Sequence, residues 1–181
     1  MINDLEIWLE RLSSLYKSQV RQAASAEGMQ VVHIEILQYL AISNHYSNTA
    51  QAISEYLGQT KGSISQSLKV LEKDGYIRRE ACKEDKRVTK LYLASQGEKA
   101  LSRFPSSVMP NLDESKESIA SIKSLLQQWQ ADNNHKGFGQ CQSCQFNRKL
   151  EDGGFQCGLT DAALSLSDTK KICREHEFVT K

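Results

Sequence analysis

The sequence predicts a mainly helical α+β protein: a winged helix-turn-helix with long dimerisation helices and a small cysteine-rich C-terminal extension. Apolar residues recur every three or four positions through most of residues 1–132, as on one face of a helix. Two short helical stretches separated by a glycine-containing turn occupy about 48–74. An alternating hairpin pattern follows at about 76–93. From residue 133 to 181 glycine and cysteine become frequent, so we place a domain boundary after residue 132.

The overall composition excludes several protein classes. The chain has 181 residues, enough for one domain and a small appendage, and its 39% hydrophobic and 25% charged residues are typical of a globular protein. It lacks an apolar run near the length of about 18 residues that a membrane helix needs. Its acidic first residues do not resemble a signal peptide. We therefore expect a cytoplasmic protein without membrane contact, whose cysteines stay reduced.

Two helices are predicted before the helix-turn-helix. Asn3 and Glu6 have the spacing of a capping box, and the helix that they start should run to about Ala26 and stop at Gly28. Its broad apolar face suits either an ordinary core helix or a helix that packs partly on another subunit. The dense apolar segment Val31–Ile42 contains β-branched residues, but its length and spacing favour a buried helix over a strand.

The helix-turn-helix is predicted from caps and a glycine. Ser47-Asn48-Thr49 supplies a cap, with Gln51 at a box-like spacing from Asn48, for a helix over Thr49–Leu57. Gly58 ends that helix because glycine tolerates the left-handed conformation. Thr60 is a good N-cap for the second helix, Thr60–Leu71.

A hairpin and two more helices are expected next. The turn Asp74-Gly75 leads into predicted strands at 76–80 and 88–93. Ser95 should then cap a helix that Pro105 interrupts. Asn111 or Asp113 should cap the last long helix, which ends at about Asp132.

The charge distribution favours nucleic-acid binding by this region. Residues 47–103 hold 11 Lys and Arg against 7 Asp and Glu, a net charge of +4, whereas the whole chain carries only +1. Cationic side chains gain affinity by releasing the counterions of DNA. The predicted contacts lie on the second helix and in the hairpin loop: Thr60, Lys61, Ser63, Ser65, Gln66, Lys69, Lys83, Lys86 and Arg87.

These side chains suit different parts of DNA. Gln66 can bind adenine through two hydrogen bonds, whereas Lys61 and Lys69 suit phosphates. Arg87 can enter a minor groove or can form an ion pair with Asp85 that shapes the hairpin tip, and the sequence does not decide between these roles.

Three motifs in register resemble the MarR-type winged-helix transcriptional regulators. The run 64–79, ISQSLKVLEKDGYIRR, is similar to the family's recognition helix and first wing strand. Asp85-Lys86-Arg87 resembles its wing motif. Leu93-Ala94-Ser95-Gln96-Gly97 resembles the start of its next helix, except that Ala94 stands where the family usually has Thr, which would leave Ser95 to cap alone. The resemblance covers roughly residues 1–132.

The resemblance implies a homodimer formed by the first and last helices. Such a dimer reads a pseudo-palindromic operator in double-stranded DNA through two recognition helices and two wings, and often represses transcription. The family also allows a small-molecule effector between the dimer helices and the DNA-reading part.

The cysteine-rich segment lies outside this resemblance and suggests a metal site. Cys141, Cys144, Cys157 and Cys173 have the spacing C-x2-C-x12-C-x15-C, and four thiolates can complete a tetrahedron around zinc. An iron–sulfur cluster is the alternative, because it also takes four thiolates and the second CxxC of a zinc ribbon is missing. His176 can substitute for one cysteine. Cys82 stands apart in the hairpin loop and is either inert or oxidation-sensitive beside Lys83.

The functional prediction is a DNA-binding transcription regulator with a metal site that is structural or sensory. In a sensory protein, metal loss should loosen the neighbouring dimer helices. The alternative is a redox or metal-handling protein whose winged helix mediates protein contacts. We do not expect an enzyme, because the sequence lacks a glycine-rich phosphate loop, GxSxG and HExxH.

Overall fold

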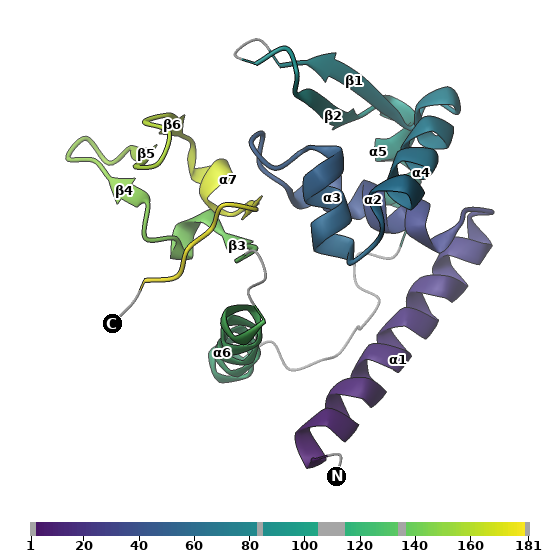
Figure 1. Cartoon of the computed structure of the whole chain (residues 1–181), viewed down its shortest axis with the longest axis horizontal. Coiled ribbons are helices and arrows are strands. Elements are labelled where there is room, and N and C mark those ends of the chain that lie inside the picture. The colour runs from purple at the N-terminus through teal and green to yellow at the C-terminus, as the bar shows by residue number, and fades with distance from the viewer. Residues whose placement is uncertain (1–2, 83–84, 105–114, 134–136, 180–181) are drawn as a thin grey trace.

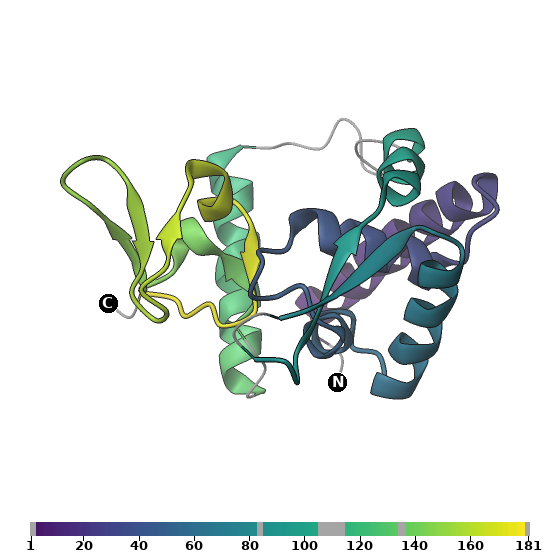
Figure 2. The same ribbon diagram turned by 90° about the horizontal axis from the view of Figure 1, so that it is seen from above.

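The computed structural model describes residues 3–82, 85–104, 115–133 and 137–179 (Figure 1). A helical part with a two-stranded hairpin forms one side of the molecule, and a small strand-rich segment forms the other, with one long helix between them (Figure 2). Among the helices in the described ranges, none combines the length and the apolar character needed to cross a membrane.

The first two helices follow the predicted boundaries. Helix α1 spans Asp4–Ala26 and begins with the predicted capping box between Asn3 and Glu6. Gly28, with φ of +65°, follows its C-terminus. Helix α2 spans Val31–Ile42 and is a buried helix, as predicted. It lies at the centre of the main core, most of whose buried side chains come from α2, the two helices after it and the hairpin.

The helix-turn-helix consists of α3 (Ala50–Leu57) and α4 (Lys61–Lys73). Thr49 caps α3 by accepting a hydrogen bond from the Ala52 N–H, and Gly58 ends α3 with φ of +63°. Thr60 caps α4 by accepting from the Ser63 N–H. The sequence prediction that Asn48 contributes a capping box is wrong, because the Asn48 side chain instead donates to the Leu91 carbonyl across 2.9 Å.

The wing is an antiparallel hairpin of β1 (Ile77–Ala81) and β2 (Thr89–Leu93), in which Ile77 pairs with Leu93. It begins one residue later than predicted, after the turn at Gly75. Helix α5 (Ser95–Arg103) follows β2. A Cβ at Gly97 would lie 2.3 Å from the Tyr76 carbonyl oxygen, so only glycine permits α5 to pack this closely on the base of the wing.

One predicted cap in this region is wrong, and another prediction falls outside the described residues. Ala94 is the N-cap of α5 and makes no side-chain capping bond, so Ser95 is the first helical residue rather than the cap. Ser115 caps α6 (Lys116–Asp132) through the Ser118 N–H. The predicted caps Asn111 and Asp113 lie outside the described residues, before a helix that begins later than expected.

The C-terminal segment is built from very short elements. These are β3 (Gly139–Gln140), the 3-10 turn η1 (Cys141–Ser143), β4 (Asn147–Lys149), β5 (Phe155–Cys157), β6 (Ala163–Leu164), α7 (Leu166–Thr169) and β7 (Ile172–Cys173). Strand β3 pairs with β7, and β4, β5 and β6 form a second small sheet. Phe138 joins the main core beside Tyr39 and Tyr56, so the segment is packed against the helix-turn-helix.

Candidate functional site

Helix α4 has a buried apolar face and an exposed polar face. Ile64, Leu68 and Leu71 are buried in the core. The predicted DNA contacts on this element, Thr60, Lys61, Ser63, Ser65, Gln66 and Lys69, are all exposed. The hydroxyl oxygen of Thr60 accepts from the Ser63 N–H at 3.2 Å, so Thr60 also fixes the start of the helix. This face can present amide, hydroxyl and ammonium donors to a groove.

The wing tip contains a closed arginine–aspartate pair. Arg87 Nε and Nη2 donate to the two Asp85 carboxylate oxygens, each at 3.1 Å, and the Arg87 N–H donates to the same carboxylate at 3.0 Å. These bonds lower the pKa of Asp85. The Arg87 side chain nevertheless stays 90% exposed. The pair therefore shapes the turn and leaves the guanidinium accessible.

Two lysines are the other cations predicted at the wing tip. Lys86 is exposed beside Arg87, whereas Lys83 lies outside the described residues. Arg79 pairs with Glu72 across 2.8 Å and joins β1 to the end of α4. This pair therefore links the first strand of the wing to α4.

Apolar side chains stay exposed on the two helices predicted to form a dimer. On α1 these are Leu5, Trp8, Leu12 and Leu15, and on α6 they are Ile119, Ile122, Leu126 and Trp129. Trp8 is 70% exposed and Ile122 is 61% exposed. A groove of about 530 Å³ lies between the helices, lined by Leu9 and Leu12 of α1 and by Ile122 and Trp129 of α6. An exposed apolar groove of this kind is a candidate contact surface for another protein chain.

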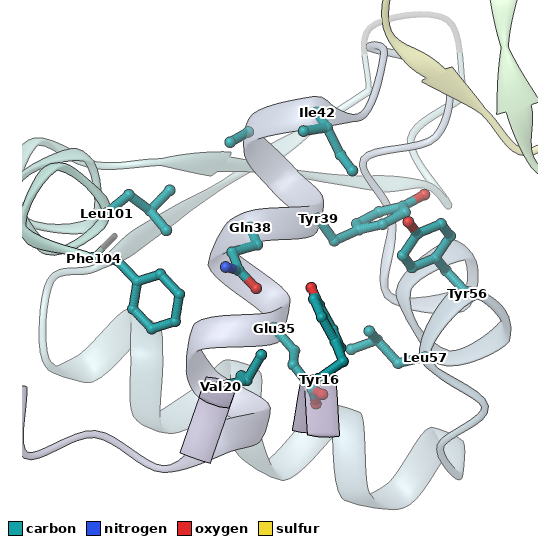
Figure 3. A pocket seen from close by; sticks show the side chains of 11 residues that line it. Tyr16, Val20, Glu35, Gln38, Tyr39, Ile42, Tyr56, Leu57, Leu101 and Phe104 are labelled. Atoms are coloured by element: carbon teal, nitrogen blue, oxygen red, sulfur yellow. The ribbon is translucent and has the colours of Figure 1, made fainter. Parts of the chain in front are cut away.

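A second cavity, of about 500 Å³, lies between α1, α2, α3 and the end of α5 (Figure 3). Tyr16 reaches into it from α1 beside Glu35 of α2, and Tyr39 and Tyr56 lie further along its wall (Figure 3). Burial raises the pKa of Glu35, and a nearby Lys17 partly opposes that shift. Burial also raises the pKa of Tyr56. The cavity thus offers apolar walls with one carboxyl and several hydroxyl groups.

All four cysteines of the C-terminal motif line one cavity of about 80 Å³. Cys141 begins η1 and Cys144 follows it, with the Cys144 N–H donating to the Cys141 carbonyl at 3.0 Å. Cys157 ends β5 and Cys173 ends β7. The structure therefore brings together residues up to 32 positions apart, counted from Cys141 to Cys173.

The chemical state of these thiols depends on their surroundings. Burial raises the pKa of Cys141 to about 11, and the other three cysteines add to the shift. For Cys173 burial also raises the pKa, although donors from Asn44, Ser47 and the Glu175 backbone oppose it. A cation in the cavity would favour the thiolate forms instead, because metal binding releases thiol protons.

His176 and Cys82 lie away from this cavity. His176 is buried, its ring packs edge-to-face on Phe178 with the ring centroids 4.4 Å apart, and its Nε2 lies 3.0 Å from the Ser143 hydroxyl. A Cβ at Gly139 would lie within 2.8 Å of the His176 ring, so the glycine makes room for it. Cys82 is half-buried directly after β1 and is not among the residues that line the four-cysteine cavity.

The loop of residues 43–48, here called the junction loop, closes the cysteine cavity from the other side. Asn44 and Tyr46 line the cavity, and the Thr160 hydroxyl donates to the Tyr46 oxygen across 3.2 Å. The Asn44 N–H donates to the Ile172 carbonyl at 2.9 Å. The Arg174 N–H donates to the Ser47 hydroxyl at 2.8 Å. Sequence reasoning missed this loop, because nothing in the local pattern of Ser43–Asn48 points to a segment about 130 residues away.

Comparisons with known proteins bear on the winged-helix part. Residues 27–88 match the model of the MarR family. This segment is therefore similar to the MarR family over about a third of the chain. A comparison with curated proteins finds no match to the chain. The family match covers α2 to the wing tip and ends before the cysteine-rich segment.

Three solved structures have a similar fold, and two of them are described as MarR family regulators. Sco3205 from Streptomyces coelicolor, a MarR family transcriptional regulator in complex with DNA, has a TM-score of 0.56 and 21% identity, and covers 76% of this chain and 96% of its own. CouR from Rhodococcus jostii RHA1, bound to p-coumaroyl-CoA, has a TM-score of 0.58 and 16% identity, and the match covers 70% of this chain and 92% of CouR. A MarR family regulator from Silicibacter pomeroyi has a TM-score of 0.58 and 17% identity, and the match covers 69% of this chain and 86% of that regulator.

Proposed function

We propose that this protein is a cytoplasmic, DNA-binding transcription regulator that acts as a homodimeric repressor on a pseudo-palindromic operator. The observation that carries the proposal is the exposed polar face of α4 beside an exposed wing arginine, on a MarR-family winged helix. Helix α4 would enter the major groove, where Gln66 and the serines can reach base edges. The wing would place Arg87 and Lys86 in the adjacent minor groove or on its phosphates.

The exposed apolar surfaces of α1 and α6 support the homodimer. A two-fold axis through these helices would bury Trp8 and Ile122 against a second copy. It would also place two recognition helices on two half-sites about 34 Å apart, the spacing of one DNA turn.

The cavity of Figure 3 supports a small-molecule effector. It lies between α1, of the proposed dimer, and α3, of the helix-turn-helix, so a bound molecule would touch both. Its volume is in the range of ligand pockets. Glu35 and the tyrosine hydroxyls favour a partly aromatic molecule that carries a hydrogen-bond donor.

The four-cysteine cavity supports a metal centre in the same protein. Thiolates are the ligands of zinc and of iron–sulfur clusters, and Cys141, Cys144, Cys157 and Cys173 are the proposed ligands. His176, the substitute that the sequence suggested, stays a prediction; its ring packs on Phe178, and it is not among the residues that line the cavity.

Salt-dependent binding to the promoter DNA of its own operon tests the DNA-binding proposal. The logarithm of the binding constant should fall steeply and linearly with the logarithm of the salt concentration. The protein should also bind one DNA sequence in preference to others. Absence of DNA binding at every salt concentration would favour the alternative, a redox or metal-handling protein whose winged helix contacts other proteins.

A further inference from the structure

The geometry of the cysteine cavity bears on which metal it takes. A tetrahedral zinc site with bonds of about 2.3 Å brings its four sulfurs to roughly 3.8 Å from one another. Across the described parts of the chain, no three His, Cys, Asp or Glu side chains converge closely enough to hold one ion. The four thiols nevertheless face a single cavity of about 80 Å³. They thus surround a shared space rather than a single point.

An iron–sulfur cluster fits such a space. Its iron and sulfide atoms lie between the cysteine sulfurs, so its four ligands stand further apart than those of a single ion. The remaining wall is largely apolar, with Phe146, Leu159 and Leu164. Asn44 lines the same cavity and offers an amide group of the kind that stabilises cluster thiolates.

We propose that this cavity holds an iron–sulfur cluster, and that the cluster controls operator binding by fixing the junction loop through Cys173. The proposal rests on the proposed function as a DNA-binding regulator. From the sequence alone, we expect metal loss to act on DNA binding by loosening the dimer helices. Here the cluster would instead act through direct contacts with the helix-turn-helix and the wing.

The first step of this route runs from Cys173 to the helix-turn-helix. Arg174 follows the ligand directly, and its N–H donates to Ser47 at 2.8 Å. Its guanidinium forms a two-pronged pair with Glu55 of α3, at 2.5 and 2.9 Å. Such paired geometry transmits position as well as charge. Strand β7 is only two residues long, and Cys173 is its last residue, directly before Arg174.

The second step runs from the junction loop to the wing. The Asn48 amide donates to the Leu91 carbonyl at 2.9 Å, and the Leu91 N–H donates to the Asn48 carbonyl at 2.8 Å. The Lys90 ammonium donates to the His45 carbonyl at 2.7 Å and to the Tyr46 carbonyl at 3.3 Å. Strand β2 of the wing is therefore tied to the loop that closes the cysteine cavity.

Loss of the cluster should weaken DNA binding. Without its cluster the cavity loses the bonds that hold Cys173, and the tie between β7, the junction loop and β2 becomes looser. Coupling between two sites of one protein typically changes affinity by about five- to 150-fold. We therefore expect operator binding to be about tenfold weaker in the cluster-free protein.

The test uses the full chain purified without oxygen. Broad visible absorption, with iron and acid-labile sulfide in equal amounts, is the expected result. Operator binding is then measured at one salt concentration before and after the cluster is removed with a chelator, and circular dichroism checks that the helices persist. The cluster-free protein should bind about tenfold more weakly.

Three variants distinguish the effect of the cluster from the effect of the contacts that link it to the helix-turn-helix. Cys173→Ser should lose the cluster and bind like the cluster-free protein. Arg174→Ala leaves all four cysteines in place, so it should keep the absorption but reduce the ratio between the two affinities by at least about threefold. Lys149→Ala is the matched control, because Lys149 is an exposed cation of β4 in the same segment, and it should change neither quantity.

Three results distinguish the possible failures. A colourless protein with one zinc per chain would overturn the cluster assignment. Equal operator affinity with and without the cluster, or an unchanged ratio in Arg174→Ala, would overturn the route. A coloured protein that binds no DNA under any condition would instead refute the proposed function while leaving the cluster assignment standing.

Discussion

Arg87 is the wing residue for which the structure permits two roles that experiment can separate. Its guanidinium is 90% exposed although it pairs with Asp85. Replacing it by alanine should therefore leave the unfolding midpoint unchanged, since exposed ion pairs contribute little to stability. If Arg87 reaches the DNA, the same substitution should weaken operator binding by about five- to 150-fold.

The Arg87→Ala substitution should also change how strongly operator affinity depends on salt concentration. Each neutralised phosphate contributes about 0.9 to the slope of the logarithm of the binding constant against the logarithm of salt. The proposed dimer carries two wings, so loss of one phosphate contact per wing should reduce the slope by about 1.8.

Asp85→Ala is the matched variant. It removes the acceptor of both Arg87 bonds and of the Arg87 N–H, so it releases the turn but keeps the cation. Fluorescence anisotropy with operator DNA at several salt concentrations should show a reduced slope for Arg87→Ala and an unchanged slope for Asp85→Ala. Equal losses of affinity in both variants, with no change of slope in either, would show that Arg87 only shapes the wing and would refute the contact.

Three further substitutions test the recognition helix, the dimer and the junction loop. Thr60→Ala removes the cap of α4 and should lower the free energy of unfolding by about 1 kcal/mol in urea titrations, whereas Thr60→Ser should keep it. Ile122→Glu places a charge in the apolar groove and should shift sedimentation from dimer to monomer, whereas Gln127→Glu, on the exposed polar side of α6, should not. Tyr39→Phe removes the buried hydrogen bond to the Ser47 carbonyl and should cost about 1 kcal/mol in the same titrations; an unchanged midpoint would show that this bond does not stabilise the loop.

Local signals in the sequence predicted most of the helical framework. The capping box at Asn3, the glycine at Gly58 and the cap at Thr60 each act within a few residues, and all three are confirmed. The wrong caps at Ser95 and Asn48 share one cause. A serine or asparagine near a helix start is a good cap by composition, but tertiary contacts decide which residue occupies the position.

The cysteine cavity shows the opposite limit of sequence reasoning. The spacing of the cysteines predicted that the four would act together, and they line one cavity. The spacing could not predict that Asn44 and Tyr46 complete its wall, because that contact depends on how the C-terminal segment docks on the helix-turn-helix. Arg174 likewise looks like a surface residue in the sequence, yet it pairs with Glu55, 119 positions earlier.

The junction loop is the point at which the two candidate regulatory sites meet. Tyr39 lines the cavity of Figure 3, and its hydroxyl donates to the Ser47 carbonyl at 2.9 Å. The hydroxyl of the same serine accepts from Arg174, next to the proposed cluster ligand Cys173. An effector that moves Tyr39 and a cluster that fixes Cys173 would therefore act on one residue. Because both inputs share the loop that carries the wing, their effects on operator affinity should not be additive, as is expected of sites that bias a single two-state element.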